Sequence, residues 1–137
     1  RVMCHGDTHG FNNHVYTDAD GVRRAAFFDF DDAGPGFLAY DLCVWLWSNL
    51  PRKAPMEPDE ALLQRWQQYL AGYRAGGGHV TDADLAALPL FVQLRHLWNM
   101  GEGVARIHHW GANMMSADWI KKQPEVMPAS ARLDLPA

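Results

Sequence analysis

The feature that most constrains this chain is a pair of strand-like segments near its start, separated by turn-forming residues. Residues 13–16 and 22–30 read as strands, and the sequence Thr-Asp-Ala-Asp-Gly lies between them. This pattern predicts a β-hairpin. A third short strand is predicted at residues 2–4 and leads into a loop at residues 5–12. The hairpin is expected to bring that loop close to Asp29.

The loop and the hairpin carry residues that phosphoryl transfer requires. The loop reads His-Gly-Asp-Thr-His-Gly-Phe-Asn, which places Asp7 five residues before Asn12, and Asp29 follows the apolar run Phe27-Phe28. Catalysts of the kinase type need one carboxylate that orients the attacking hydroxyl and receives its proton. They also need an Asn and a second carboxylate that hold Mg²⁺ against the phosphates. The sequence therefore indicates kinase-type chemistry.

Helical patterns follow the hairpin. Residues 33–36 are expected to break the chain, and the almost wholly apolar residues 37–50 predict a helix that is buried on most sides. Residues 51–58 are expected to form a linker that ends at Pro58, a residue suited to the first turn of the next helix. That helix continues with apolar residues at helical spacing to the glycines at 76–78.

The remaining sequence is also mainly helical. Thr81 and Asp84 resemble a capping box, which opens a helical region to about residue 109 that is kinked or interrupted near Pro89. Ser116 is expected to cap a last helix, and the residues from Pro124 onward read as a frayed end or a linker. The predicted fold class is α+β, mainly α-helical with a small β-hairpin that carries the site.

Taken together, these motifs resemble the aminoglycoside phosphotransferase / choline kinase-like superfamily, a group related to the eukaryotic protein kinases. The resemblance rests on His-Gly-Asp-x-x-x-x-Asn, on the apolar strand that ends in Asp, and on Tyr40-Asp41-Leu42 at the start of an apolar helix. It covers residues 2–50 by motif and, more loosely, the helices to about residue 122. The amino-acid sequence of residues 29–33 is most similar to that of the branch containing the stress-response Ser/Thr kinase and homoserine kinase-like proteins.

The resemblance implies a role for each motif residue. Asp7 would be the catalytic base, and Asn12 and Asp29 would bind Mg²⁺ and, through it, ATP. Asp41 would hold the backbone of the catalytic loop. The implied fold is the C-terminal lobe of a protein kinase-like enzyme.

The family's N-terminal lobe has no counterpart in this sequence, because no Gly-rich loop, phosphate-binding Lys or paired helix Glu precedes Asp7. We therefore expect residues 1–123 to form the C-terminal lobe, residues 124–137 to be a tail or linker, and an N-terminal ATP-binding lobe to be encoded upstream of Arg1. The isolated fragment should bind nucleotide poorly and turn over little or nothing.

Three functions remain open at this point. The first is an ATP- and Mg²⁺-dependent phosphotransferase that acts on a hydroxyl of a small molecule such as an aminoglycoside, choline or homoserine. The second is a Ser/Thr protein kinase of the stress-response type. An open acceptor groove would favour this second function, whereas a closed pocket would favour a small-molecule acceptor. The third is a non-catalytic kinase-like binding module. Neither the acceptor nor the nucleotide, ATP or GTP, is determined by the sequence.

Other polar residues near the motif have alternative interpretations. His5 is expected to pack and form hydrogen bonds. His9 could approach the substrate, but the interpretation without substrate contact is favoured. A zinc site made of Cys4, His5, His9 and His14 is disfavoured because the spacing matches no zinc motif. One of Asp31 and Asp32 could contact the metal or substrate, but exposed loop carboxylates are the favoured interpretation.

A polar series falls on or near one side of the long helix at three-to-four-residue spacing and comprises Arg95, His96, Asn99, Glu102 and Arg106. It either lines an acceptor pocket or forms a solvated face, and the solvated face is favoured. Trp45 and Trp47 are expected in the core. The other four tryptophans could include a substrate wall, which would suit a quaternary ammonium ligand; these are Trp66, Trp98, Trp110 and Trp119.

Composition excludes several classes of partner. The formal net charge of −4 over 137 residues argues against nucleic acid or an anionic membrane as the main partner. Two cysteines do not suggest a disulfide framework, and no apolar run approaches the roughly 20 residues of a membrane span. A cytoplasmic protein is expected.

Overall fold

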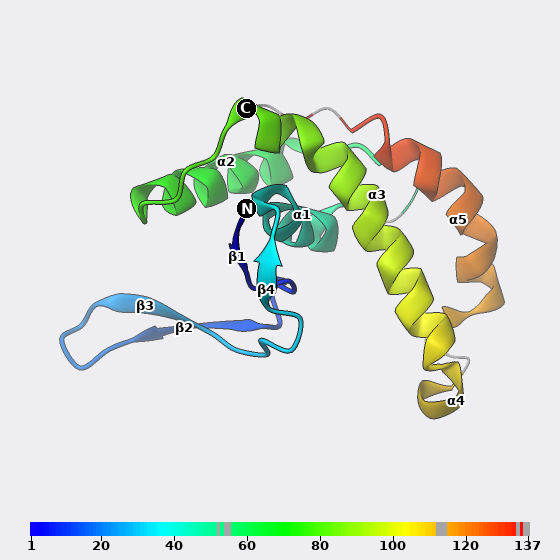
Figure 1. The fold of residues 1–137 in the computed structure, drawn as a ribbon, viewed down its shortest axis with the longest axis horizontal. Coiled ribbons are helices and arrows are strands. Elements are labelled where there is room, and N and C mark those ends of the chain that lie inside the picture. The colour runs from blue at the N-terminus through cyan, green and yellow to red at the C-terminus, as the bar shows by residue number, and fades with distance from the viewer. Residues whose placement is uncertain (52, 54–55, 112–114, 134, 136–137) are drawn as a thin grey trace.

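The computed structural model describes residues 1–51, 53, 56–111, 115–133 and 135 (Figure 1). Its elements are β1 (Val2–Cys4), β2 (Asn13–Thr17), β3 (Arg23–Phe27), β4 (Gly34–Gly36), α1 (Leu38–Asn49), α2 (Glu60–Ala75), α3 (Asp82–Ala105), α4 (Ile107–Trp110) and α5 (Ala117–Ser130). Figure 1 shows the helices gathered on one side and the β2–β3 hairpin extending away from them. The chain is α+β, as the sequence predicts.

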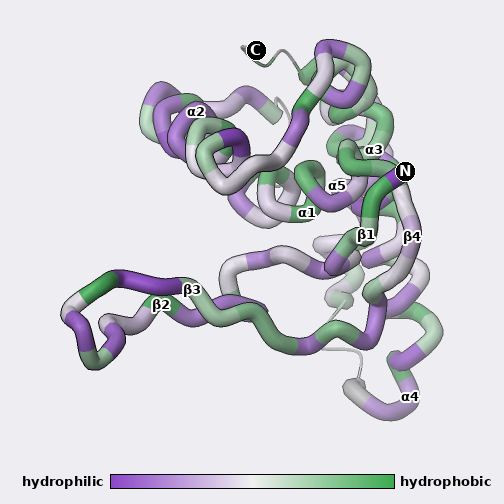
Figure 2. The backbone as a smooth tube through the Cα atoms, turned by 60° about the vertical axis from the view of Figure 1, so that its left-hand side comes forward, coloured by the Kyte–Doolittle hydropathy of each residue, from purple (hydrophilic) through white to green (hydrophobic). Residues whose placement is uncertain are grey.

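The strands form two separate antiparallel pairs within the described residues. The expected hairpin is confirmed, with Asn13 opposite Phe27 and Thr17 opposite Arg23. Its second strand ends at Phe27, so Asp29 lies in the loop that follows and not at the end of a longer strand. The aromatic part of this loop is hydrophobic (Figure 2), and Phe28 and Phe30 are exposed.

The second pair corrects the expectation of a simple break at residues 33–36. Gly34–Gly36 forms β4 and pairs with β1, so that Cys4 lies opposite Gly34. Pro35 lacks an N–H donor, but a ladder with only one partner strand leaves one edge free and tolerates it. A Cβ on Gly36 would lie 2.9 Å from Cys4 Sγ, so this close pairing depends on glycine.

The hydrophobic core surrounds α1, which packs against α3. Leu42, Val44 and Leu46 of α1 are fully buried, as is Trp66 of α2. Burial raises the pKa of the Cys43 thiol to about 12, which keeps it protonated in the core. Cys4 and Cys43 are both free cysteines.

The helix starts follow local capping chemistry. The carboxylate of Asp59 accepts the N–H of Leu62 at 2.7 Å, so α2 begins after Asp59 and Pro58 lies outside its first turn, contrary to expectation. The capping box of Thr81 and Asp84 at the start of α3 is confirmed. Ser116 also caps α5, as predicted, by accepting the N–H of Trp119 at 3.2 Å.

The structure contradicts the interruption expected near Pro89 and the frayed end expected from Pro124 onward. Helix α3 continues through Pro89 without interruption, because the buried residues Leu88 and Val92 hold both sides of the proline in the core. Helix α5 continues past Pro124 to Ser130, and Val126 is buried against the core, so the frayed end does not begin at Pro124. Tertiary packing of an apolar face outweighs the loss of a single helix hydrogen bond at each site.

Some sequence-based expectations concern residues that lie outside the described part of the chain. The linker predicted over 51–58 includes residues 52, 54 and 55, and the side chain of Trp110 is likewise outside the described part. The division of the chain at residues 123 and 124 into a lobe and a tail stays a prediction. Among the described residues, no helix combines the length and the apolar character needed to cross a membrane.

Candidate active site

The loop that carries Asp7 connects β1 to β2 and is held by the first turn of α1. Oδ2 of Asp41 accepts the backbone N–H of His5 at 2.9 Å, and its Oδ1 accepts that of Gly6 at 2.8 Å. The hydroxyl of Thr8 donates to the carbonyl of Asp41 at 2.9 Å. A carboxylate in the first turn of a helix is also favoured by the helix dipole. Asp41 therefore supports the backbone of the loop, as expected.

His5 joins the same loop to the segment before Asp29. Its Nδ1 accepts the N–H of Asp7 at 3.3 Å, while its Nε2 lies 3.0 Å from the carbonyl oxygen of Phe28. Because a carbonyl only accepts, Nε2 is the donor in this contact. The buried ring also contacts Phe30, with centroids 4.4 Å apart. This agrees with the expected packing and hydrogen-bonding role of His5.

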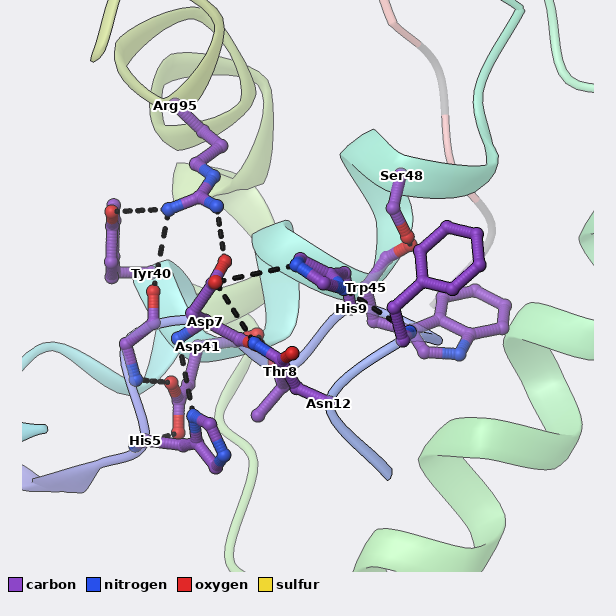
Figure 3. Close-up of polar contacts among 12 residues, drawn as sticks. His5, Asp7, Thr8, His9, Asn12, Tyr40, Asp41, Trp45, Ser48 and Arg95 are labelled. Atoms are coloured by element: carbon purple, nitrogen blue, oxygen red, sulfur yellow. Dashed lines mark hydrogen bonds and ion pairs between the residues drawn. The ribbon is translucent and has the colours of Figure 1, made fainter. Parts of the chain in front are cut away.

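Asp7 is the centre of a polar cluster (Figure 3). Its Oδ2 accepts a hydrogen bond from Nδ2 of Asn12 at 2.9 Å and lies 3.3 Å from Nε2 of His9. Its Oδ1 forms an ion pair with Arg95, which reaches it from α3. The carboxylate is thus oriented by partners on both oxygens.

Asn12 lies beside Asp7 and is 5% exposed. Its Nδ2 donates to both the carbonyl and the carboxylate of Asp7, at 3.0 and 2.9 Å, so the atom that would bind a metal is the amide oxygen Oδ1. The backbone carbonyl of Asn12 accepts the N–H of Phe28 at 3.2 Å. This bond places Asn12 next to the residue that precedes Asp29.

Asp29 has a left-handed backbone conformation, with φ of 64°. Such conformations cost energy in residues other than glycine and occur often at functional sites. Asp29 lines the same pocket as Asp7, together with Asp31 and Asp32. The structure therefore brings Asp7, Asn12 and Asp29 to one end of the hairpin.

The pocket has a volume of about 860 Å³ and lies between the loop that carries Asp7 and helix α3. Its lining includes four residues of the polar series on α3, namely Arg95, Asn99, Glu102 and Arg106. The series is therefore not a uniformly solvated face: it lines a pocket, Arg95 is buried, and His96, its fifth member, is fully buried. Trp98 and Trp119 also line the pocket, whereas Trp66 belongs to the core.

A series of hydrogen bonds between side chains holds Trp47 and Trp119, two of the tryptophans that line the pocket. Nε1 of Trp47, which also lines the pocket, donates to Nδ1 of His96 at 3.2 Å. Nε2 of His96 lies 2.6 Å from Oε1 of Gln123, and Gln123 donates to the carbonyl of Trp119 at 2.6 Å. This chain connects α1, α3 and α5 behind the pocket.

The contact between Arg95 and Asp7 was not predicted from the sequence. One signal was present: Leu88, Val92 and Arg95 follow the four-and-three spacing of a single helix face, and the first two are apolar. An arginine on an apolar face needs a buried partner. Sequence alone does not show which carboxylate provides it.

The donor set suits magnesium better than zinc. The described residues contain no group of three or more His, Cys, Asp or Glu side chains that could hold a metal ion. One carboxylate from Asp29 and one amide oxygen from Asn12 are hard ligands, and Mg²⁺ typically completes its shell with waters and phosphate oxygens. The residues therefore fit a Mg²⁺–nucleotide complex.

Comparison with known proteins gives the class of this protein. Residues 1–79 match the Phosphotransferase enzyme family (APH), and the chain belongs to this family. It is also 41% identical over 112 residues to an uncharacterized protein of Deinococcus radiodurans, a match that covers 82% of this chain. The chain spans 30% of the length of that relative. No solved structure matches this chain.

Proposed function

We propose that the protein is an ATP- and Mg²⁺-dependent kinase that transfers the γ-phosphate to a hydroxyl group of a small molecule. Membership of the phosphotransferase family supports the reaction class. The observation that carries the proposal is that Asp7 and Asp29 line one pocket while Asn12 is hydrogen-bonded to Asp7. Three separate motif residues thereby serve one site.

In this reaction Asp7 orients the acceptor hydroxyl and receives its proton. The hydroxyl oxygen forms a bond to the γ-phosphorus, and the bond from that phosphorus to the bridging oxygen breaks, so that ADP leaves. Asn12 and Asp29 would hold the Mg²⁺ that neutralises the phosphate charge. Positioning supplies most of the rate enhancement in such a step.

The shape of the pocket supports a small acceptor. A volume of about 860 Å³ with tryptophan walls is typical of a small-molecule site, which usually has about 300–1,000 Å³. A Ser/Thr protein kinase remains the second candidate because the same three residues would serve it. A non-catalytic module is the third, and it gives no reason for Asp7 and Asp29 to face one pocket.

The ATP-binding lobe is proposed to lie outside these residues, in the complete protein. No Gly-rich phosphate loop occurs between a strand and a helix in this sequence. Residues 1–123 would then supply the catalytic and acceptor half of the enzyme and would turn over little alone. The two free, buried cysteines suit a cytoplasmic location.

The test is ATP consumption by the complete protein with Mg²⁺ across a panel of acceptors: aminoglycosides, choline, homoserine, sugars and a generic protein substrate. We expect stimulation by a small acceptor and loss of that signal in Asp7→Asn. The matched control is Asp20→Asn in the exposed hairpin turn, which should retain activity. Stimulation only by protein would favour the second candidate. Absence of both Mg²⁺–ATP binding and turnover would favour the third.

A further inference from the structure

We propose that Arg95 is a positioning residue that holds one carboxylate oxygen of Asp7 and thereby presents the other to the acceptor hydroxyl. This inference rests on the proposed function, because it assumes that Asp7 is the catalytic base. Arg95 lies on α3, 88 positions after Asp7 along the chain, and outside residues 1–79, which match the family.

The guanidinium group of Arg95 is anchored from several directions. Its Nη2 pairs with Oδ1 of Asp7, and its Nη1 lies 3.4 Å from the carbonyl oxygen of Gly6 and 3.3 Å from the hydroxyl of Tyr40 (Figure 3). Arg95 thus contacts both the side chain of Asp7 and the backbone just before it. A planar fork with several donors can fix the orientation of a carboxylate in a way that a single ammonium group does not.

Two tryptophans also hold the guanidinium group in place. Its Cζ lies 4.2 Å from the ring centroid of Trp98 and 5.5 Å from that of Trp47, both within the range of cation–π attraction. Both rings line the pocket. Arg95 therefore contacts both the tryptophan wall of the pocket and the carboxylate of Asp7, so the position of that wall affects the orientation of Asp7.

Stability alone is a poor reason for this arrangement. Arg95 is 3% exposed, and its Nε is buried without a hydrogen-bond partner among the described residues. Burying a charge is costly, and apolar residues of similar volume often replace a buried ion pair with no loss of stability. A functional requirement at Asp7 accounts for the charge at this position.

The ion pair also distinguishes the two oxygens of Asp7. Oδ1 is held by Arg95, whereas Oδ2 faces Asn12 at 2.9 Å and His9 at 3.3 Å. The side chain of His9 is 24% exposed and makes the longer contact, so it can yield its place to a hydroxyl group. Residues 5–12 contain no Lys or Arg, so the loop itself provides no cation for Oδ1.

The test uses steady-state kinetics of the complete protein with Mg²⁺–ATP and the most stimulating acceptor of the panel, or water if none stimulates. In Arg95→Ala we expect kcat to fall about 100-fold, as a displacement of about 1 Å can cause, while KM for Mg²⁺–ATP is unchanged. Arg95→Lys should recover part of kcat because it keeps the charge but not the fork. Added guanidinium at millimolar concentration should partly restore Arg95→Ala, whereas tetramethylammonium should not.

Controls separate this proposal from the proposed function. Arg65→Ala, at an exposed arginine of α2, should retain wild-type kcat. Tyr40→Phe removes one anchor of Arg95 without leaving a buried charge, and it should lower kcat moderately even if Arg95→Ala does not fold. Inactive wild type, or active Asp7→Asn, would overturn both proposals. A folded Arg95→Ala with wild-type kcat, or no rescue by Lys or guanidinium, would overturn the role of Arg95 only.

Discussion

The carboxylate of Asp41 accepts the backbone N–H of Gly6 at 2.8 Å, and this bond joins the first turn of α1 to the loop that carries Asp7. A second bond from the N–H of His5 engages the other carboxylate oxygen. Asp41 is itself anchored within the helix that forms the centre of the core. The position of the candidate base therefore depends on a helix that is held in place by its buried apolar side chains, among them Leu42, Val44 and Leu46.

Replacement of Asp41 by Ala should destabilise the protein and impair catalysis together. Two backbone N–H groups would lose a charged acceptor, and each such bond contributes about 1.5–3 kcal/mol. We expect the free energy of unfolding of the complete protein to fall by about 3–6 kcal/mol in denaturant titrations, the sum of two such bonds. Asp59→Ala, which removes one cap of α2, serves as a control that should lower stability by only about 1 kcal/mol. Equal losses in the two variants would contradict the role of Asp41.

Gly6 should not tolerate a side chain. It has φ of 83°, and a Cβ at this position would lie 2.3 Å from the carbonyl oxygen of Asp32. Gly6→Ala should therefore separate the loop that carries Asp7 from the loop after β3 and cost more than about 1 kcal/mol in thermal or chemical unfolding. The matched control is Gly72→Ala in α2, where a Cβ meets nothing within 4 Å. That change should stabilise the helix by about 0.5–1 kcal/mol, and a stable Gly6→Ala protein would refute the close approach.

Local chemistry made part of this structure predictable. The capping box of Thr81 and Asp84 and the cap at Ser116 depend on neighbours three residues away, so the sequence contains all the information. The hairpin of β2 and β3 was also predictable because its turn lies between its strands. Contacts between distant segments were not. The pairing of Gly34–Gly36 with Val2–Cys4 and the approach of Arg95 to Asp7 depend on packing that no local pattern reveals.

The candidate site likewise contains residues that the sequence predicts and residues that only the structure reveals. The motif in residues 5–12 and Asp29 point to phosphoryl transfer because each residue type has a defined task in that reaction. The polar series on α3 was interpreted as a solvated face, since spacing shows which residues share a side but not what that side contacts. The pocket shows that Asn99, Glu102 and Arg106 face the same space as Asp7.

Replacement of Asp29 by Gly should raise stability and abolish activity. Asp29 has φ of 64°, a conformation that costs about 1 kcal/mol or more in a residue with a side chain and little in glycine. The same change removes the carboxylate proposed to bind Mg²⁺. We therefore expect a higher melting temperature and no Mg²⁺-dependent turnover. Asp31→Gly in the same loop is the control for stability, and it should not raise the melting temperature because it relieves no positive φ. A less stable Asp29→Gly protein would contradict the strain argument.

The capping box of α3 gives a pH-dependent prediction. The hydroxyl and the N–H of Thr81 donate to the carboxylate of Asp84, and these hydrogen bonds lower the pKa of that carboxyl below its usual value. A lowered pKa in the folded state stabilises the protein at pH values above the unfolded pKa of about 3.9, and this contribution disappears as the pH falls through the folded value.

Asp84→Ala should therefore lower the free energy of unfolding at pH 7 by about 0.5–1 kcal/mol, since a capping interaction is lost at an exposed helix end. Asp82→Ala is the matched control, because it removes a carboxylate from the same first turn and gains the same helix propensity of alanine. Urea titrations at pH 7 and at about pH 3 or below should show the difference between the two variants shrinking as the Asp84 carboxylate of the parent protein becomes protonated. A difference that is constant with pH would mean that the ionised carboxylate of Asp84 does not stabilise the start of α3.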